Sequence, residues 1–230
     1  MVDGTTHILS LGPCDLFVDW LARQAPTASV RQVIAFGSTS ADTKFDSSSA
    51  EERALAQSLR QSEQQLAEQC QRLGVAWTLL RPTLIYGGDT DLVARIAQFA
   101  RRWHVYPRPI GRAARALRQP VHASDLAQAV VRSIDNPAAA NRRFDLPGPQ
   151  SLSLTALIRR AAQAGSRLAC PIPLPLGMLL RFGDAFGVVR GQSGLNHSAA
   201  ARLGRDQVFD MTPARTALGF APRAFEPEPR

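Results

Sequence analysis

Short apolar runs alternate with helix-like patterns along most of this chain, and that alternation limits the possible folds more than any other feature. Runs typical of strands cover His7–Leu11, Gln32–Phe36 and Val75–Leu80, and a helical pattern follows each of them. Nearly all-apolar strands separated by helices are typical of a parallel sheet whose two faces are both covered. We therefore expect an α/β fold built on a parallel sheet with helices on both faces.

The longest expected helix covers Ala50–Leu73 and ends at Gly74, a residue that commonly stops helices. Apolar spacing predicts one buried stripe on it, formed by Leu55, Leu59, Leu66, Cys70 and Leu73. Other helices are expected at Pro13–Arg23, Asp91–Arg102, Ser124–Ile134, Ser153–Ala164 and near 176–189. Short strands are expected at Pro120–His122 and Arg143–Leu146, and a basic loop at Pro107–Ala116.

The length of 230 residues is enough for one large domain, or for one domain with a small partner. We expect a sheet-bearing domain over residues 1–150 and a small, mostly helical region over 151–230. In open parallel sheets, ligands bind beyond the carboxyl ends of the strands. Three loops are placed there by the pattern: Leu11–Pro13, Gly37–Asp42 and Arg81–Gly88.

Charge and cysteine content limit the partners. There are 27 Lys and Arg residues against 19 Asp and Glu, a net charge of +8, and Lys44 is the only lysine. The arginines are scattered, so we interpret them as biased composition; neither nucleic acid nor a membrane is an expected partner. The forked N–H donors of arginine suit phosphate groups, so a phosphate-bearing ligand is an open alternative.

The cysteines limit metal binding and redox state. Cys14, Cys70 and Cys170 lack metal-ligand spacing, which predicts no metal and reduced thiols. Without a signal-like N-terminus, the expected location is cytoplasmic.

Four segments together carry a family resemblance. They are QVIAF with GSTS (32–40), WTLLRPTLIYGG (77–88), LRQPVHASDLAQAVVRSIDNP (117–137) and RRFDLPGPQSLSLTALIRRAA (142–162). In this order they resemble the later part of an NAD-dependent epimerase/dehydratase, an extended or atypical short-chain dehydrogenase/reductase. The resemblance covers about residues 7–165 and implies a Rossmann sheet with a small C-terminal substrate region.

The resemblance also implies an NAD or NADP cofactor, a nucleotide-sugar substrate and a set of site residues. It places Thr39 at the family's catalytic Ser/Thr, with the alternative that Thr39 only satisfies its loop. The positions that would face the cofactor are Gly12, Ser38, Pro82 and Thr83. The positions that would face the substrate are Tyr86, Arg112, Arg118 and His122. A purely structural or solvent-exposed role is the alternative for each of them.

The glycine-rich turn that cradles the pyrophosphate in this family has no counterpart here, because no Gly-x-x-Gly-x-x-Gly occurs in the chain. His7–Leu11 already resembles the family's fourth strand, so we expect an N-terminally incomplete sheet. Either Met1 is a late start or the protein is truly shortened. A shortened sheet would expose an edge and an apolar face, which predicts a homodimer or a partner protein.

The family's catalytic Tyr-x-x-x-Lys is absent at every register. In the family, the lysine lies one helical turn after the tyrosine and lowers its pKa. The residue four before Lys44 is Ser40, and the alignment of the long helix places Leu59 and Glu63 at the tyrosine and lysine positions.

Three hypotheses follow from these departures. The first is an atypical nucleotide-sugar epimerase or dehydratase that works without Tyr/Lys chemistry. The second is a non-catalytic dinucleotide-binding or assembly protein of the same superfamily. The third is an anion-surface binder driven by the positive charge.

Overall fold

The computed structural model describes residues 4–26, 29–175, 178 and 204–228, and contacts divide the chain into two compact units that alternate along the sequence. The first unit comprises Met1–Thr83, Asp125–Pro147 and Phe209–Ala221, and the second comprises Leu84–Ser124, Gly148–Val208 and Pro222–Arg230. The expected boundary near residue 150 lies close to the point where the chain passes from the first unit to the second, between Pro147 and Gly148. The assignment of an NAD(P)-binding role and a substrate role to the two regions stays a prediction.

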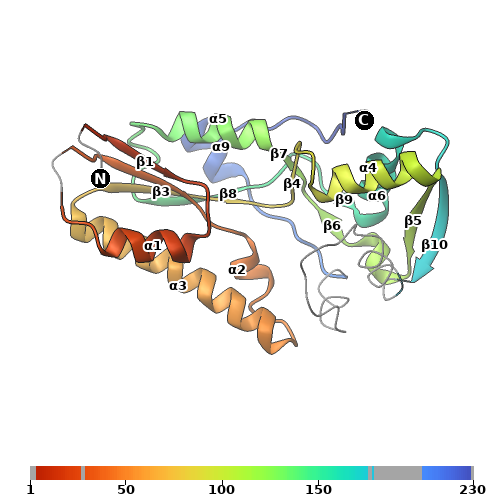
Figure 1. Ribbon diagram of the computed structural model, residues 1–230, viewed down its shortest axis with the longest axis horizontal. Helices are drawn as coiled ribbons and strands as arrows, with labels where there is room; N and C mark the ends of the chain where they lie inside the picture. Colours follow the sequence, from red (N-terminus) through yellow and green to blue (C-terminus); the bar gives the residue numbers. More distant parts are fainter. Residues whose placement is uncertain (1–3, 27–28, 176–177, 179–203, 229–230) are drawn as a thin grey trace. The chain divides into compact units, whose positions relative to one another are not determined.

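A four-stranded parallel sheet forms the centre of the first unit. Its strands are β1 (His7–Ser10), β2 (Gln32–Phe36), β3 (Ala76–Pro82) and β8 (Arg142–Leu146), in the order β1-β2-β3-β8. The helices are α1 (Cys14–Ala22), α2 (Ser40–Thr43), α3 (Ala50–Leu73), α5 (Ala123–Ser133) and α9 (Thr212–Leu218). α1 and α3 cover one face, and α5 and α9 cover the other (Figure 1). The expected α/β fold with a parallel sheet is confirmed.

Residues that alternate along β2 and β3 serve the two faces separately. Val33, Ala35 and Leu79 point toward α1 and α3, where they pack with Leu21 and Leu66 in one buried cluster. Gln32 points the other way: its amide nitrogen donates to Ser133 O at 2.7 Å, and its amide oxygen accepts from Asp135 N at 2.9 Å. The period of two in a strand thus fixes α3 on one face and the end of α5 on the other.

α3 has the predicted bounds and conventional ends. The Ser49 side chain accepts a hydrogen bond from Glu52 N, and Gly74 adopts the left-handed conformation with φ 68°. The predicted buried stripe is partly wrong, because Leu55 is 43% exposed and Leu59 is half-buried. Ala56 and Glu63 instead continue the buried face above Leu66, Cys70 and Leu73.

The second unit has short strands and two packed helices. Its elements are β4 (Ile85–Tyr86), α4 (Leu92–Trp103), β5 (Val105–Ile110), the 3₁₀ helix η1 (Arg112–Arg115), β6 (Leu117–Arg118), β7 (Val121–His122), β9 (Leu152–Ser153), α6 (Leu154–Gly165) and β10 (Cys170–Pro175). The core between α4 and α6 contains Ile96, Ala100, Leu157 and Ala161. The helix expected near 176–189 lies outside the described residues, apart from Met178.

The expected basic loop at Pro107–Ala116 is wrong, because Val105–Ile110 forms a strand that pairs in parallel with β10. Both strands resemble loops in the sequence because they contain prolines at alternate positions. These are residues 107 and 109 in β5 and residues 171, 173 and 175 in β10. The N–H groups of a parallel strand point alternately to its two sides, so prolines at every second position can all face away from the partner.

Gly165 permits the close approach of α6 to α4. A Cβ atom on Gly165 would lie 1.8 Å from the carbonyl oxygen of Ala97, so one backbone would have to move. We expect Gly165→Ala to lower the free energy of unfolding by about 1–3 kcal/mol, measured by urea denaturation. The control is Gly12→Ala, because a Cβ on Gly12 meets nothing within 4 Å. Equal effects of the two substitutions would contradict the packing argument.

Candidate functional site

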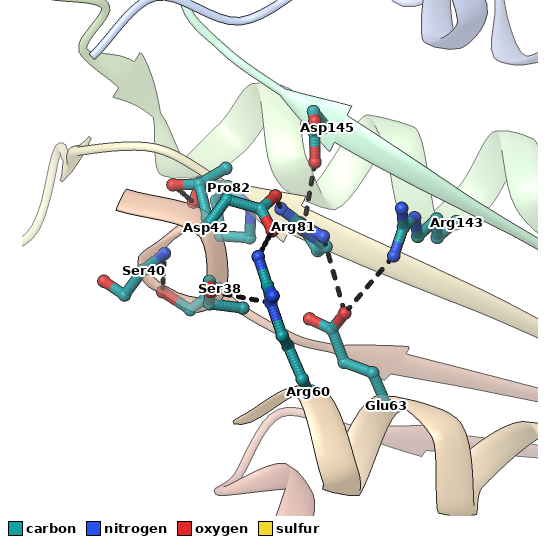
Figure 2. A network of polar contacts seen from close by, with 11 residues as sticks. Ser38, Ser40, Asp42, Arg60, Glu63, Arg81, Pro82, Arg143 and Asp145 are labelled. Carbon is teal, nitrogen blue, oxygen red and sulfur yellow. Dashed lines mark hydrogen bonds and ion pairs between the residues drawn. The ribbon is translucent and has the colours of Figure 1, made fainter. Parts of the chain in front are cut away.

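Four elements of the first unit bring charged side chains together where the strands of the sheet end. Arg81 comes from β3, Asp145 from β8, Glu63 from α3, and Asp42 from α2, the short helix that follows β2 (Figure 2). Because Arg81 and Leu79 lie two residues apart on one strand, Arg81 points to the same face as Leu79, toward α3. This group, together with Arg60 and Arg143, is called the Arg81 cluster below.

Arg81 is the largest fully buried side chain in the described residues, with 1% of its surface exposed. Its Nη2 donates a short hydrogen bond to Asp42 Oδ2, and its Nη1 donates to Glu63 Oε2 at 3.4 Å. Nε lies 3.0 Å from Asp145 Oδ1, but without hydrogen-bond geometry, so this contact is an ion pair. A buried guanidinium requires such partners, since the loss of its hydration costs several kcal/mol.

Arg60 and Arg143 are more exposed than Arg81, and they balance the remaining negative charge of the three carboxyl groups. Arg60 Nη2 lies 3.2 Å from Asp42 Oδ1, and Arg60 Nε donates to Ala41 O at 3.1 Å. Arg143 Nη1 lies 3.9 Å from Glu63 Oε2 (Figure 2). The cluster therefore has three guanidinium groups and three carboxyl groups. It is a continuous network of ion pairs in which Arg81 contacts all three carboxyl groups.

The three carboxyl groups of the cluster differ in pKa. Burial raises the pKa of Asp42, but hydrogen bonds and charges of Arg81 and then Arg60 outweigh it, so the net pKa is lowered. Burial dominates at Glu63 and raises the pKa of that carboxyl, although Arg81 and Arg143 oppose the shift. Burial likewise raises the pKa of Asp145. Asp42 is therefore the firmly ionised partner of Arg81.

Glu63 is only partly satisfied. Its Oε1 atom is buried and makes no hydrogen bond. That oxygen lies against the backbone of Gly37, where a Cβ atom would approach it to 2.8 Å. Gly37 is therefore explained by the packing of α3 against the end of β2. A carboxyl group at this position cannot supply the positive charge of an ammonium group.

The predicted cofactor-facing positions lie at this edge of the sheet. The Thr39 hydroxyl donates to Pro82 O at 3.2 Å, and Ser38 Oγ accepts from Ser40 N at 3.1 Å. Both hydroxyl groups thus satisfy loop backbone atoms. Gly12 is exposed with open space around it, and Thr83 directly follows β3. The structure brings Thr39 and Pro82 into contact, and a role in binding stays a prediction for all five residues.

The predicted substrate-facing residues belong to the second unit. The Tyr86 hydroxyl donates to Ala224 O at 3.2 Å, and the Tyr86 ring meets His122 edge-on with centroids 5.0 Å apart. His122 Nδ1 accepts from Ser124 N at 3.1 Å. Arg118 is buried and donates to the carbonyl groups of Leu117 and Arg205, whereas Arg112 is exposed. Of these four residues, Tyr86 and His122 are in contact.

Tyr86 and His122 also line a small hollow of about 30 Å³. Its other walls include Asp91, Glu226 and Glu228. Asp91 is already occupied as the cap of α4, since it accepts hydrogen bonds from Gly87 N, Gly88 N and Ala94 N. Neither Arg112 nor Arg118 lines the hollow. An acidic rim of this kind is the opposite of what a diphosphate requires.

The described residues contain no group of three His, Cys, Asp or Glu side chains that could hold a metal ion. Among the helices of the same residues, none is long and apolar enough to cross a membrane.

Of the residues in the Arg81 cluster, the sequence had singled out only Glu63. One signal for it was available, because Arg81 is the charged residue in the otherwise apolar run VAWTLLRP.

No family model matches the chain. Two curated relatives are each 26% identical. One is the mouse mitochondrial NADH dehydrogenase [ubiquinone] 1 alpha subcomplex subunit 9, over 48% of this chain and 29% of that protein. The other is UDP-glucose 4-epimerase from Vibrio cholerae, over 70% of this chain and 47% of that protein. The chain thus spans less than half the length of either relative.

Solved structures show the same fold. UDP-glucose 4-epimerase from Thermotoga maritima, crystallised with UDP-glucose, matches with a TM-score of 0.62 at 16% identity, over 94% of this chain and 72% of that chain. UDP-glucuronic acid 4-epimerase from Bacillus cereus, in complex with UDP-glucuronic acid and NAD, matches with a TM-score of 0.60 at 12% identity, over 92% and 61%. The chain is thus similar in sequence to one UDP-glucose 4-epimerase and similar in fold to two solved UDP-sugar 4-epimerases. The resemblance found in the sequence is confirmed.

The Arg81 cluster predicts a large difference between its inner and its outer arginine. Arg81→Gln leaves three carboxyl groups around a neutral amide, and we expect it to lower the free energy of unfolding by about 3–5 kcal/mol. Arg60→Gln removes a half-exposed partner of the same Asp42 and should cost less than about 1 kcal/mol. Chemical denaturation measures both, and similar losses would contradict this network of ion pairs.

The raised pKa of Glu63 predicts a pH-dependent difference between the wild type and Glu63→Gln. A carboxyl whose pKa is raised by folding binds its proton more tightly in the folded state, so it adds stability as the pH falls. The wild type should therefore gain stability over Glu63→Gln between the raised pKa and the ordinary value of 4.5. Denaturation curves at several pH values measure the difference, and one that shrinks on acidification would refute this assignment.

Proposed function

We propose that this chain belongs to a non-catalytic dinucleotide-binding or assembly protein of the epimerase/dehydratase superfamily. The observation that carries the proposal is Glu63, which is buried and ion-paired with Arg81 where the aligned family has its catalytic lysine. An anionic group there cannot lower the pKa of a neighbouring phenol, and position 59 offers no phenol. The fold is therefore retained without the residues that transfer the proton in the family's reaction.

The described residues do not by themselves fit an NAD(P) molecule. The chain has no glycine-rich turn between a strand and a helix to receive the pyrophosphate. Gly37 follows β2, but its backbone lies against the Glu63 carboxyl group, which accounts for the glycine without a cofactor. The hydroxyl groups of Ser38 and Thr39 hydrogen-bond to backbone atoms. No reaction step is derived through this cofactor.

Similarity to a protein named as a subunit supports the assembly role. The mouse relative is named as a subunit of NADH dehydrogenase, and the matched region covers 48% of this chain. In such a role, the protein would be held by a homodimer contact or by a partner protein. The edge strand β1 is a suitable element, because among the described residues it pairs only with β2, and Leu9 on it is 48% exposed. A cytoplasmic location is part of the same proposal.

An NAD(P)-dependent nucleotide-sugar epimerase or dehydratase is the second candidate. It is supported by the similarity to UDP-glucose and UDP-glucuronic acid 4-epimerases. In that case, Thr39 would hydrogen-bond the reacting oxygen, and Gly12, Ser38, Pro82 and Thr83 would face the cofactor. Tyr86, Arg112, Arg118 and His122 would face the nucleotide-sugar. The reaction would have to proceed without Tyr/Lys chemistry.

Turnover and binding measurements distinguish the two candidates. With UDP-glucose or UDP-glucuronic acid and either NAD or NADP, we expect no change in NAD(P)H absorbance and no epimerised sugar. Calorimetric titration with NADH and light scattering of the purified chain should show at most binding or self-association. Epimerised product that disappears in Thr39→Val would overturn the non-catalytic role. A monomer that binds no dinucleotide and no partner would also count against it.

A further inference from the structure

The positive charge of this protein belongs almost entirely to one of its two units. The second unit contains sixteen of the basic residues and six of the acidic ones, whereas the first has eleven basic and thirteen acidic residues. No Asp or Glu occurs between Asp91 and Asp125, or between Asp145 and Asp184. The second unit therefore has a formal charge of +10 and the first of −2, so the positive field of the protein comes from the second unit.

Exposed apolar side chains accompany these arginines where α4 ends. Trp103, the last residue of α4, is 53% exposed, and the Arg102 guanidinium lies over its ring, 4.8 Å from the centroid. Leu168 is 83% exposed, which is the largest value among the exposed large hydrophobic residues of the described chain. An aromatic ring next to a guanidinium is a common arrangement at the boundary between water and lipid.

Hydrogen bonds hold the turn with Arg167 and Leu168 beside the end of α4. His104 Nδ1 and Ser166 Oγ lie 3.2 Å apart, and Cys170 N donates to His104 O at 2.8 Å. The turn leads directly into β10, on which Ile172 is 42% exposed. We call this region the α4–β10 surface; it consists of Arg101, Arg102, Trp103, Arg167, Leu168 and Ile172. All six residues are exposed, and all belong to the second unit; the helix α4 and the strand β10 are labelled in Figure 1.

We propose that the α4–β10 surface docks on an anionic phospholipid bilayer. Arginines near a bilayer are attracted by the negative headgroups, and tryptophan and leucine side chains insert at the boundary between headgroups and acyl chains. A nucleic acid would use the arginines equally well, but phosphate and sugar give Leu168 and Ile172 little to bury against. The combination of charge with exposed aliphatic side chains therefore favours lipid over another polyanion. The association is peripheral and goes beyond the proposed function.

Vesicle co-sedimentation of the full chain tests this docking. We expect retention on vesicles of phosphatidylcholine mixed with phosphatidylglycerol, and none on phosphatidylcholine alone. Each arginine removed should weaken binding on the order of fivefold, so R101Q/R102Q should lose roughly twenty-fivefold. L168S removes only apolar surface at constant charge, and should weaken binding roughly tenfold. Circular dichroism confirms that each variant is folded.

The matched control is R23Q/R215Q, which removes two exposed arginines from the first unit. It has the same net charge as R101Q/R102Q and should retain vesicle binding within about twofold. Heparin chromatography separates lipid docking from binding to any polyanion. Three results would overturn the proposal: no retention on anionic vesicles, an equal loss in both double variants, or wild-type vesicle binding by L168S with strong heparin retention.

Discussion

A guanidinium without water is the constraint on which the sheet-bearing unit depends. Arg81 is buried at the end of a central strand, and it has three carboxyl groups from three other elements as partners. Because each partner comes from a different segment, the cation fixes α2, α3 and β8 against β3 at one point. It also explains Gly37, since the Glu63 carboxylate occupies the space where a side chain at position 37 would lie. The conformation of the loop after β2 thus follows from electrostatics rather than from loop sequence alone.

The burial of Arg81 also limits which residue can stand at position 63. A lysine at position 63 would place a second cation beside Arg81 and within reach of Arg143, with its positive charge buried. The cost of such a like-charge contact in a site without water is large. The Arg81 cluster therefore does not tolerate a lysine at position 63. The network needs an acid there, because Glu63 is the partner of both Arg81 and Arg143.

Sequence reasoning located the sheet because apolar strands and helix ends are local signals. Gln32–Phe36 and Ala50–Leu73 were predicted with the bounds that the structure shows. It failed where the deciding interaction lies between distant residues. Leu55 fits a helical stripe but is 43% exposed, and Ala56 and Glu63 are buried on α3 instead. The β5–β10 pair was missed because proline signals a loop when the partner strand, some sixty residues away, is not considered. Arg81 alone could have been noticed, because a charged residue inside an apolar run needs a partner.

Net charge is a further property that the sequence gives only as an average. The value of +8 describes neither unit, because one is close to balanced and the other is strongly basic. The balance has different causes in the two units. Arginines in the first unit, such as Arg60, Arg81 and Arg143, are matched by nearby carboxyl groups. In the second unit, Arg118 donates to carbonyl oxygens and Arg102 lies over a tryptophan ring. A positive charge satisfied by neutral groups still has its long-range field, and this field supplies the electrostatic part of the proposed lipid docking.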